Sequence, residues 1–367
     1  MASNRTLICC AYSFGYGPAA KLLHLARRLA GEDFRLVFLG SGIAHELASR
    51  SRVFHDVIPA APADRRTRDM LASGAGVLSL MDREFSAIAL ECGKPVFLVD
   101  SLLWMRDQLP AVFRDATRFF AQNFPGVELR LDEIGPNARL VGPIVGQRGP
   151  GQARNGSRFV VNLGGCEAPR SAVGDDPSYF DFVARGLFES DLLGEGTVVL
   201  GGSQCIRYLR SRYPGRGVEM ISASHDDALN LMGQARCVLT SPGLTATLEC
   251  FQLGVPTFFL PPQNFSQWWI LATLRSRGLA PRSFHSDDVN PDLGIVEHMH
   301  EGGRLQRVRE AIRQVAQGDR GKRIFRDSVM GLAAENLDEL TRRQMTFFDS
   351  LGPDGTAQVV RELLELM

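Results

Sequence analysis

The 367-residue chain has no excess of charge of either sign. Lys and Arg together total 41 and Asp and Glu together total 41, so the formal net charge at pH 7 is zero. A balanced chain has no global field to attract polyanions or an anionic membrane surface, and we expect no nucleic-acid partner. Lysine is rare, at Lys21, Lys94 and Lys322, whereas arginine is abundant, a bias that indicates a GC-rich bacterial source.

The chain also lacks paired cysteine spacings and long apolar runs. Its seven cysteines form no CxxC or Cys/His pattern, and Cys9 and Cys10 lie inside an apolar run. Scattered thiols of this kind are typical of a reduced cytoplasmic protein and predict no metal site. No run approaches the roughly 18 apolar residues that span a bilayer, so we expect no integral membrane segment. The short run Leu7–Tyr12 is expected to be a first strand rather than a signal peptide.

What the chain does contain is a regular alternation of strand-length apolar runs and helix-period segments. It begins with a strand at Leu7–Tyr12, a helix at Ala19–Leu29 and a strand at Arg35–Leu39, an order that predicts a parallel sheet. The pattern restarts with a strand at Phe159–Leu163. Further expected strands are Val53–Val57, Gly76–Met81, Pro95–Val99, Arg139–Pro143, Val198–Leu200, Val218–Ile221, Cys237–Thr240 and Thr257–Leu260.

The length exceeds what a single hydrophobic core usually supports, which favours two domains. Between the two alternating halves lies a stretch of Gly, Gln, Arg and Pro without apolar periodicity, a linker composition. The expected organisation is an N-terminal domain at 1–145, a linker at 146–156, a C-terminal domain at 157–345 and a last helical segment at 346–367.

The most informative stretch is Val238–Gln267, which reads VLTSPGLTATLECFQLGVPTFFLPPQNFSQ. A buried strand ends at Thr240, and a tight turn containing Gly243 leads into a helix. Helix N-terminal amides favour a phosphate, and a glycine there lets the backbone approach it closely. Glu249, two turns into the helix, is placed to accept hydrogen bonds from a ribose diol beside that phosphate. Phosphate and diol together predict a nucleotide, whereas the plain alternative is a strand, turn and helix without a ligand.

This stretch resembles the donor-binding signature of GT-B glycosyltransferases, of both the natural-product type and the peptidoglycan N-acetylglucosaminyl type. The resemblance implies two Rossmann-like α/β domains with parallel sheets facing across a cleft and a C-terminal helix that returns to the first domain. It places Ser241, Gly243 and Thr247 near the diphosphate, Glu249 on the ribose and Gln267 on the donor sugar, and Thr245 is a further donor-site residue. Two positions depart from the family: Ser241 stands where a His is frequent, and Ser266 where an Asp usually precedes the Gln.

Two other segments of the second half match donor-site positions of that family. Gly164 and Gly165 follow the first strand, at the loop that faces the donor phosphates, although a bare turn has the same sequence. His225 lies where the family closes over the nucleobase; a solvent-facing His at a helix start is the alternative. Asp226 and Asp227 beside it form no DxD metal motif and fit helix N-terminal charges.

In the first half, Ser13–Leu29 reads SFGYGPAAKLLHLARRL and resembles the glycine-rich opening of the family's acceptor domain. It places Ser13, Tyr16 and Gly17 on the acceptor side. The family's catalytic His is missing from this turn, and His24 lies two turns inside the expected helix, which favours a core or surface role.

Carboxylates at strand ends are the replacement bases that we expect. Asp82 and Glu84 follow one expected strand and Asp100 follows another, and ligands of open α/β sheets gather at the carboxyl ends of strands. Asp100 is the first choice, because an apolar wall of Leu103 and Trp104 would make its carboxylate a better base. Trp104 is also expected to line the acceptor site; a helix cap and core packing are the plain alternatives.

The resulting functional hypothesis is a cytoplasmic, metal-independent glycosyltransferase without a cofactor. It would transfer a sugar from a UDP- or dTDP-sugar to a small-molecule acceptor, in natural-product or cell-envelope biosynthesis. A nucleotide-sugar hydrolase or epimerase and a catalytically silent nucleotide-sugar-binding protein stay open as alternatives. A homodimer stays open as the oligomeric state.

Overall fold

A computed structural model describes residues 5–146, 158–166, 177–189, 196–214, 217–289 and 301–367. The chain divides into two compact units, which are described separately. The first unit comprises Met1–Gln147, Glu167–Pro169 and Asp349–Met367, and the second comprises Arg148–Cys166 and Arg170–Phe348. The expected linker at 146–156 lies outside the described residues except for Gly146.

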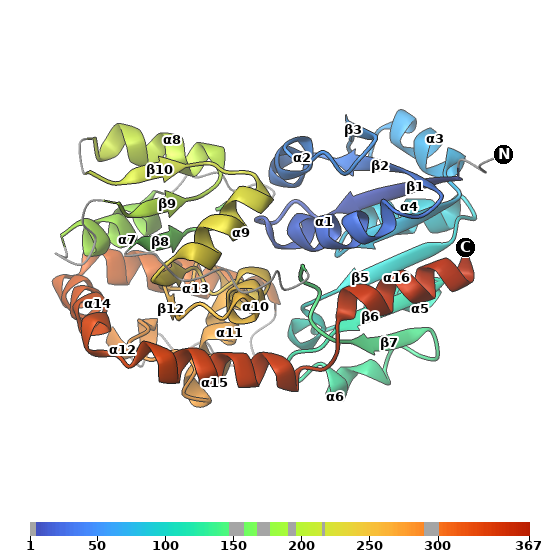
Figure 1. Cartoon of the computed structure of the whole chain (residues 1–367). Helices are drawn as coiled ribbons and strands as arrows, with labels where there is room; N and C mark the ends of the chain where they lie inside the picture. The colour runs from blue at the N-terminus through green and yellow to red at the C-terminus, as the bar shows by residue number, and fades with distance from the viewer. Residues whose placement is uncertain (1–4, 147–157, 167–176, 190–195, 215–216, 290–300) are drawn as a thin grey trace. The chain divides into compact units, whose positions relative to one another are not determined.

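The first unit is built on a seven-stranded parallel sheet with strand order β3-β2-β1-β4-β5-β6-β7 (Figure 1). Every residue of the β5 sequence VFLVD is buried, as expected for a parallel strand that is covered on both faces. The strands are β1 Arg5–Ala11, β2 Phe34–Gly40, β3 Asp56–Pro59, β4 Gly76–Leu80, β5 Val96–Asp100, β6 Arg118–Gln122 and β7 Ala138–Val141.

The first unit is completed by helices that connect its strands and by a C-terminal helix. They are α1 Gly17–Leu29, α2 Gly42–Ser49, α3 Arg65–Ser73, α4 Arg83–Glu91, the short turn η1 Leu103–Met105, α5 Ala111–Asp115, α6 Glu128–Leu131 and the C-terminal α16 Gly355–Leu366. The helix α16, at the red end of the colour scale, packs against α1 in this unit (Figure 1). An ion pair between Arg118 on β6 and Glu362 on α16, 2.8 Å long, joins this last helix to the sheet.

The second unit holds a five-stranded parallel sheet with strand order β10-β9-β8-β11-β12. Its strands are β8 Phe159–Asn162, β9 Val198–Leu200, β10 Glu219–Ile221, β11 Cys237–Thr240 and β12 Thr257–Phe259. Its helices are α7 Ser178–Phe188, α8 Ser203–Arg212, α9 His225–Gln234, α10 Leu244–Leu253, α11 Phe265–Ser276, α12 Ser286–Val289, α13 Glu301–Gln317, α14 Asp319–Met330, the turn η3 Gly331–Ala334 and α15 Leu337–Ser350.

Alternate residues of the second sheet face two different cores. Val161 and Leu239 join the cluster formed with α7, α13 and α14, whereas Val160 and Val238 join Met232 of α9 in a cluster on the other face. Successive side chains of a strand point to opposite faces of the sheet. Because both sets of alternate positions are apolar, helices must cover both faces.

The predicted class, two α/β units with parallel sheets, is confirmed. Several element predictions were wrong in detail. The strand expected at Val53–Val57 begins only at Asp56, and β6 at Arg118–Gln122 was not predicted. The helix α8 was also missed, because it is rich in polar residues and buries only Cys205, Ile206 and Leu209. Among the described helices, none has both the length and the apolar character that crossing a membrane requires.

Candidate functional site

The turn from β11 into α10 leaves open space in front of a helix N-terminus. The N–H of Gly243 donates to the carbonyl of Ser241 at 2.7 Å, which closes the turn, and Gly243 is the N-cap of α10. A Cβ placed on Gly243 would meet no described atom within 4 Å. The first amides of α10 have no carbonyl partner of their own in the helix and carry its positive dipole end. This end of the helix therefore has both the room and the polarity for an anion.

A second glycine turn follows the neighbouring strand β8. Asn162 and Thr240 pair in register, so the loops after β8 and β11 leave the same edge of the sheet side by side. Gly164 has φ of +72°, and a Cβ there would also meet no described atom within 4 Å. Its N–H donates to Oδ1 of Asn162 at 3.0 Å, which fixes the turn. Gly165 follows as a buried residue.

Beside these turns, α9 and α10 each contribute one buried polar side chain to a close contact between a histidine and a carboxylate. Nε2 of His225, the first residue of α9, lies 3.1 Å from Oε1 of Glu249 on α10. Their side chains are only 8% and 5% exposed. Removing a carboxylate from water is costly, so a buried Glu249 needs hydrogen-bond donors, and His225 supplies one. The sequence predicted both residues for the donor site but not their contact.

The two threonines near the start of α10 are buried rather than exposed to solvent. Thr245 is 5% exposed and Thr247 is fully buried. The hydroxyl of Thr247 has no hydrogen-bond partner among the described residues. Buried hydroxyls are normally paired, so this one is an exception in the second unit.

Hydrogen bonds tie the loop after β12 to both glycine turns. Nε2 of Gln263 donates to Oγ of Ser241 at 2.7 Å and to the carbonyl of Leu163 at 3.0 Å. The Ser241 hydroxyl also lies 3.2 Å from that carbonyl. Sequence reasoning missed Gln263, and its place directly after a Pro-Pro pair was the available signal. Ser241 is thus part of a network that joins three loops.

Gln267 has a structural contact at the start of α11. Asn264 is the N-cap of α11 and accepts a hydrogen bond from the N–H of Gln267 at 3.1 Å. In return, Oε1 of Gln267 accepts from the N–H of Gln263 at 2.8 Å. This reciprocal arrangement resembles a capping box shifted by one residue. The amide oxygen of Gln267 is therefore engaged with the loop, while its role toward a donor sugar stays a prediction.

In the first unit, Asp82 is a buried carboxylate on a strained turn. It is the N-cap of α4 and accepts from the N–H of Phe85 at 3.1 Å. Burial raises its pKa to about 6, with a smaller contribution from the charge of Glu84, against backbone hydrogen bonds that lower it. The preceding Met81 has φ of +60°, a conformation that costs a non-glycine residue about 1 kcal/mol.

Asp100 lies at the end of β5 in different surroundings. Its side chain is fully buried, its Oδ2 lies 3.1 Å from a guanidinium nitrogen of Arg106, and its Oδ1 accepts from the N–H of Leu102 at 2.6 Å. Both carboxylate oxygens of Asp100 therefore already accept hydrogen bonds from groups of the chain. The sequence predicted an apolar wall beside Asp100 and gave no indication of Arg106.

The other residues predicted for the first unit are spread over several of its elements. Glu84 is exposed in the first turn of α4. The hydroxyl of Tyr16 donates to Oε1 of Glu46 at 2.9 Å, and Gly17 begins α1. Ser13 lies in the loop between β1 and α1, and the Trp104 ring lies 6.3 Å from the ring of Phe124.

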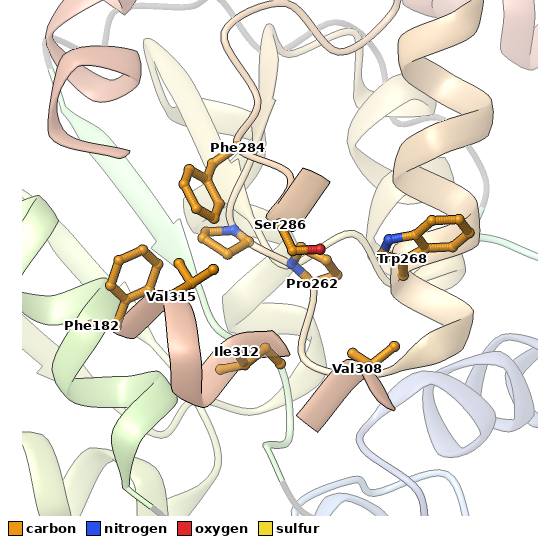
Figure 2. A pocket seen from close by; sticks show the side chains of 9 residues that line it. Phe182, Pro262, Trp268, Phe284, Ser286, Val308, Ile312 and Val315 are labelled. Atoms are coloured by element: carbon orange, nitrogen blue, oxygen red, sulfur yellow. The ribbon is translucent and has the colours of Figure 1, made fainter. Parts of the chain in front are cut away.

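A pocket in the second unit has the wrong chemistry for a diphosphate (Figure 2). Its walls are almost entirely apolar and none of its lining residues is charged. The lining residues are Phe182, Pro261, Pro262, Trp268, Phe284, Ser286, Val308, Ile312 and Val315. Without a cation or a row of free amides, such a pocket cannot offset the cost of dehydrating a phosphate. The open glycine turns beside the N-terminus of α10 suit an anion better than this pocket does.

The comparisons with known proteins bear on the fold. No protein-family model and no curated protein matches the chain. A solved UDP-glucosyltransferase from Polygonum tinctorium, capable of glucosylating indoxyl, matches with 17% identity, a TM-score of 0.51 and coverage of 100% of this chain and 99% of that one. The predicted GT-B fold is confirmed.

Arabidopsis thaliana UGT89C1 gives the same result in two complexes. With quercetin it matches at 10% identity and a TM-score of 0.58, and with UDP at 11% identity and a TM-score of 0.53. Each comparison covers 99% of both chains. At these identities the likeness establishes the GT-B fold over the whole chain and leaves the chemistry of the site to be argued from its residues.

Proposed function

We propose that the protein is a glycosyltransferase that takes a sugar from a UDP- or dTDP-sugar and transfers it to a small-molecule acceptor. The observation that carries the proposal is the edge of the second sheet, where two open glycine turns lie beside a helix N-terminus and a buried His225–Glu249 pair. An anion seat and a buried carboxylate on the same helix suit a nucleotide diphosphate better than a simple phosphate.

The donor's diphosphate would lie at the turns of Gly164 and Gly243, and its ribose hydroxyls would donate to Glu249. As the sugar leaves, negative charge grows on the diphosphate, and the amides of α10 are already oriented to stabilise it. Stabilisation of the leaving group by fixed amides requires no divalent metal, so we propose metal-independent transfer. Gln267 and Thr245 are the proposed contacts to the sugar and the phosphate.

In the first unit, we propose Asp82 as the general base, ahead of Asp100 and Glu84. A base works best when its pKa lies near the working pH, and burial raises that of Asp82 to about 6. Asp100 already accepts from Arg106 and Leu102, and Glu84 is exposed to water. Trp104, which contacts Phe124, is the proposed aromatic wall for an acceptor.

The test of catalysis is release of nucleotide diphosphate from a panel of UDP- and dTDP-sugars by the full chain. Each donor is incubated with and without small aromatic acceptors. These include indoxyl, which the Polygonum tinctorium enzyme can glucosylate, and quercetin, which is bound in one UGT89C1 complex. Acceptor-dependent release together with a glycosylated product supports the proposal. Release without acceptor indicates a hydrolase, and donor binding without any release indicates a silent binding protein.

The test of the site is Gly243→Ser. Serine is a good N-cap residue and its Cβ meets no described atom within 4 Å, so the fold is retained while the open space is filled. We expect UDP affinity to fall at least about tenfold, since close backbone approach to the phosphate is blocked. Gly31→Ser is the matched control, because a Cβ on Gly31 would also meet no described atom within 4 Å and Gly31 lies in the first unit. Unchanged UDP affinity in Gly243→Ser would place the diphosphate elsewhere.

A further inference from the structure

We propose that His225 is a positioning residue for the donor's ribose: it holds the Glu249 carboxylate in the orientation that receives the ribose hydroxyls. The inference rests on the proposed function, because it presupposes a nucleotide at this site. It assigns His225 to the ribose rather than to the nucleobase, where the family resemblance places it.

The contact that carries the inference is short and buried. Nε2 of His225 lies 3.1 Å from Oε1 of Glu249, and neither side chain is more than 8% exposed. A glutamate side chain has three rotatable bonds, and holding it in one geometry costs rotamer entropy. A hydrogen bond from His225 to Oε1 of Glu249 fixes the side chain before the nucleotide binds, so that less entropy is lost on binding. The same bond sets the plane of the carboxylate and so the position of its other oxygen.

The helices that hold the two side chains are themselves fixed to one another. Ser224 is the N-cap of α9: its hydroxyl accepts from the N–H of Asp227 at 3.2 Å and lies 2.6 Å from Oδ2 of the same residue. Farther along, Sγ of Cys250 on α10 lies 3.9 Å from Sδ of Met232 on α9, within a shared apolar cluster. His225 is therefore the first residue of the capped helix α9, and the other end of α9 packs against α10, which carries Glu249.

Three possible roles of His225 can be told apart by their effects on ligand affinity and stability. A residue that acts through Glu249 affects only ligands that carry the ribose hydroxyls. A residue that contacts the base affects ribose and dideoxyribose nucleotides equally. A residue that only supports the fold lowers the melting temperature without changing the preference between the two.

The experiment compares UDP with 2′,3′-dideoxy-UDP as ligands of the full chain, by isothermal titration calorimetry. The variants are His225→Ala, His225→Gln, Glu249→Ala and the double variant, each checked by its melting temperature. We expect the parent to prefer UDP by about tenfold or more, as for hydroxyls bound to a charged acceptor. His225→Ala should remove most of that preference while leaving the affinity for dideoxy-UDP unchanged.

Two further results are expected if His225 acts through Glu249. His225→Gln retains an N–H donor and should restore at least part of the preference for UDP. In the Glu249→Ala background, His225→Ala should have no additional effect on UDP, because the group that it positions is gone.

Other outcomes overturn the inference in distinguishable ways. Equal losses for UDP and dideoxy-UDP in His225→Ala would assign the residue to the base or to the fold, and no loss for either would remove it from the site. A parent that binds UDP without preferring it to dideoxy-UDP would overturn the inference and leave the diphosphate site standing. A parent that binds neither UDP nor dTDP would overturn the proposed function itself, and the inference with it.

Discussion

The two units use the same kind of parallel sheet but end their strands differently. In the second unit, the loops after β8 and β11 contain Gly164 and Gly243, and space is left open above both. In the first unit, Asp82 follows the end of β4 by two residues and Asp100 is the last residue of β5, and both carboxylates are buried. A helix start with open glycines attracts an anion, whereas a strand end with a carboxylate repels one and accepts protons. On this difference rests our proposal that the diphosphate binds the second unit and that the proton chemistry belongs to the first.

The largest effect that would test this division is expected from Asp82→Asn. The change removes the proposed base but keeps an N-cap residue of almost the same shape, so turnover should fall by about 10²- to 10⁴-fold. UDP affinity should stay unchanged, because the proposed nucleotide site belongs to the second unit. Steady-state kinetics and calorimetry on the same preparation measure both. If turnover is unaffected, the proton leaves by another route, and Glu84→Gln is the next variant to examine.

Asp100→Asn should instead reveal a structural carboxylate. Its partner Arg106 is 9% exposed, and removing the negative charge that balances this buried guanidinium should lower the free energy of unfolding by about 3 to 5 kcal/mol. Urea denaturation measures this, with Asp327→Asn as the control. Asp327 pairs with Arg326 at 3.7 Å on the surface, where a pair contributes less than about 1 kcal/mol. A stable Asp100→Asn protein with low turnover would restore Asp100 as the base.

The raised pKa of Asp82 also predicts a pH dependence of stability. Its folded-state pKa of about 6 exceeds the ordinary 3.8, so its protonation stabilises the fold fully below pH 3.8, and this contribution is lost as the pH rises through 6. Asp82→Asn does not titrate, so its stability relative to the parent should increase by about 2 to 3 kcal/mol between pH 4 and pH 7.5. Denaturation at the two pH values provides the measurement. A constant difference would mean that Asp82 is not desolvated in the folded protein.

In the second unit, Glu249→Ala should weaken UDP binding by about 1 to 3 kcal/mol, because the ribose loses a charged acceptor. Calorimetry on the full chain checks the loss. Glu219→Ala, on an exposed position at the start of β10, is the control and should bind UDP as the parent does. Equal affinities for Glu249→Ala and the control would remove the carboxylate from the nucleotide site.

The smallest expected effect separates the two roles of Gln267. Gln267→Ala removes the oxygen that caps the N–H of Gln263 and should cost about 0.5 to 1.5 kcal/mol of stability. Gln267→Glu keeps that oxygen but loses the amide donors that a sugar hydroxyl would use. We expect both variants to impair turnover of the nucleotide sugar, with UDP binding nearly intact and only Gln267→Ala destabilised. Normal turnover in Gln267→Glu would limit the residue to capping.

Local pattern was sufficient to predict the fold class and the β11–turn–α10 segment. Strand β5 is a continuous apolar run, and the Ser-Pro-Gly turn before α10 is encoded in three consecutive residues, so neither depends on distant contacts. The strand β6 escaped prediction because its five residues RFFAQ begin and end in polar side chains. The strand β6 forms because it pairs with β5 and β7 in the sheet, and those partners are not evident from its own five residues.

The sequence by itself determined where the glycine turns, the carboxylates and the helix starts would occur, since backbone conformation and apolar periodicity are read over a few residues. Only the tertiary structure decided which of these groups meet. Asp100 with Arg106, His225 with Glu249 and Gln263 with Ser241 are contacts between different elements or loops. Strand register and helix packing bring such atoms to within about 3 Å, and neither register nor packing is encoded at any single position.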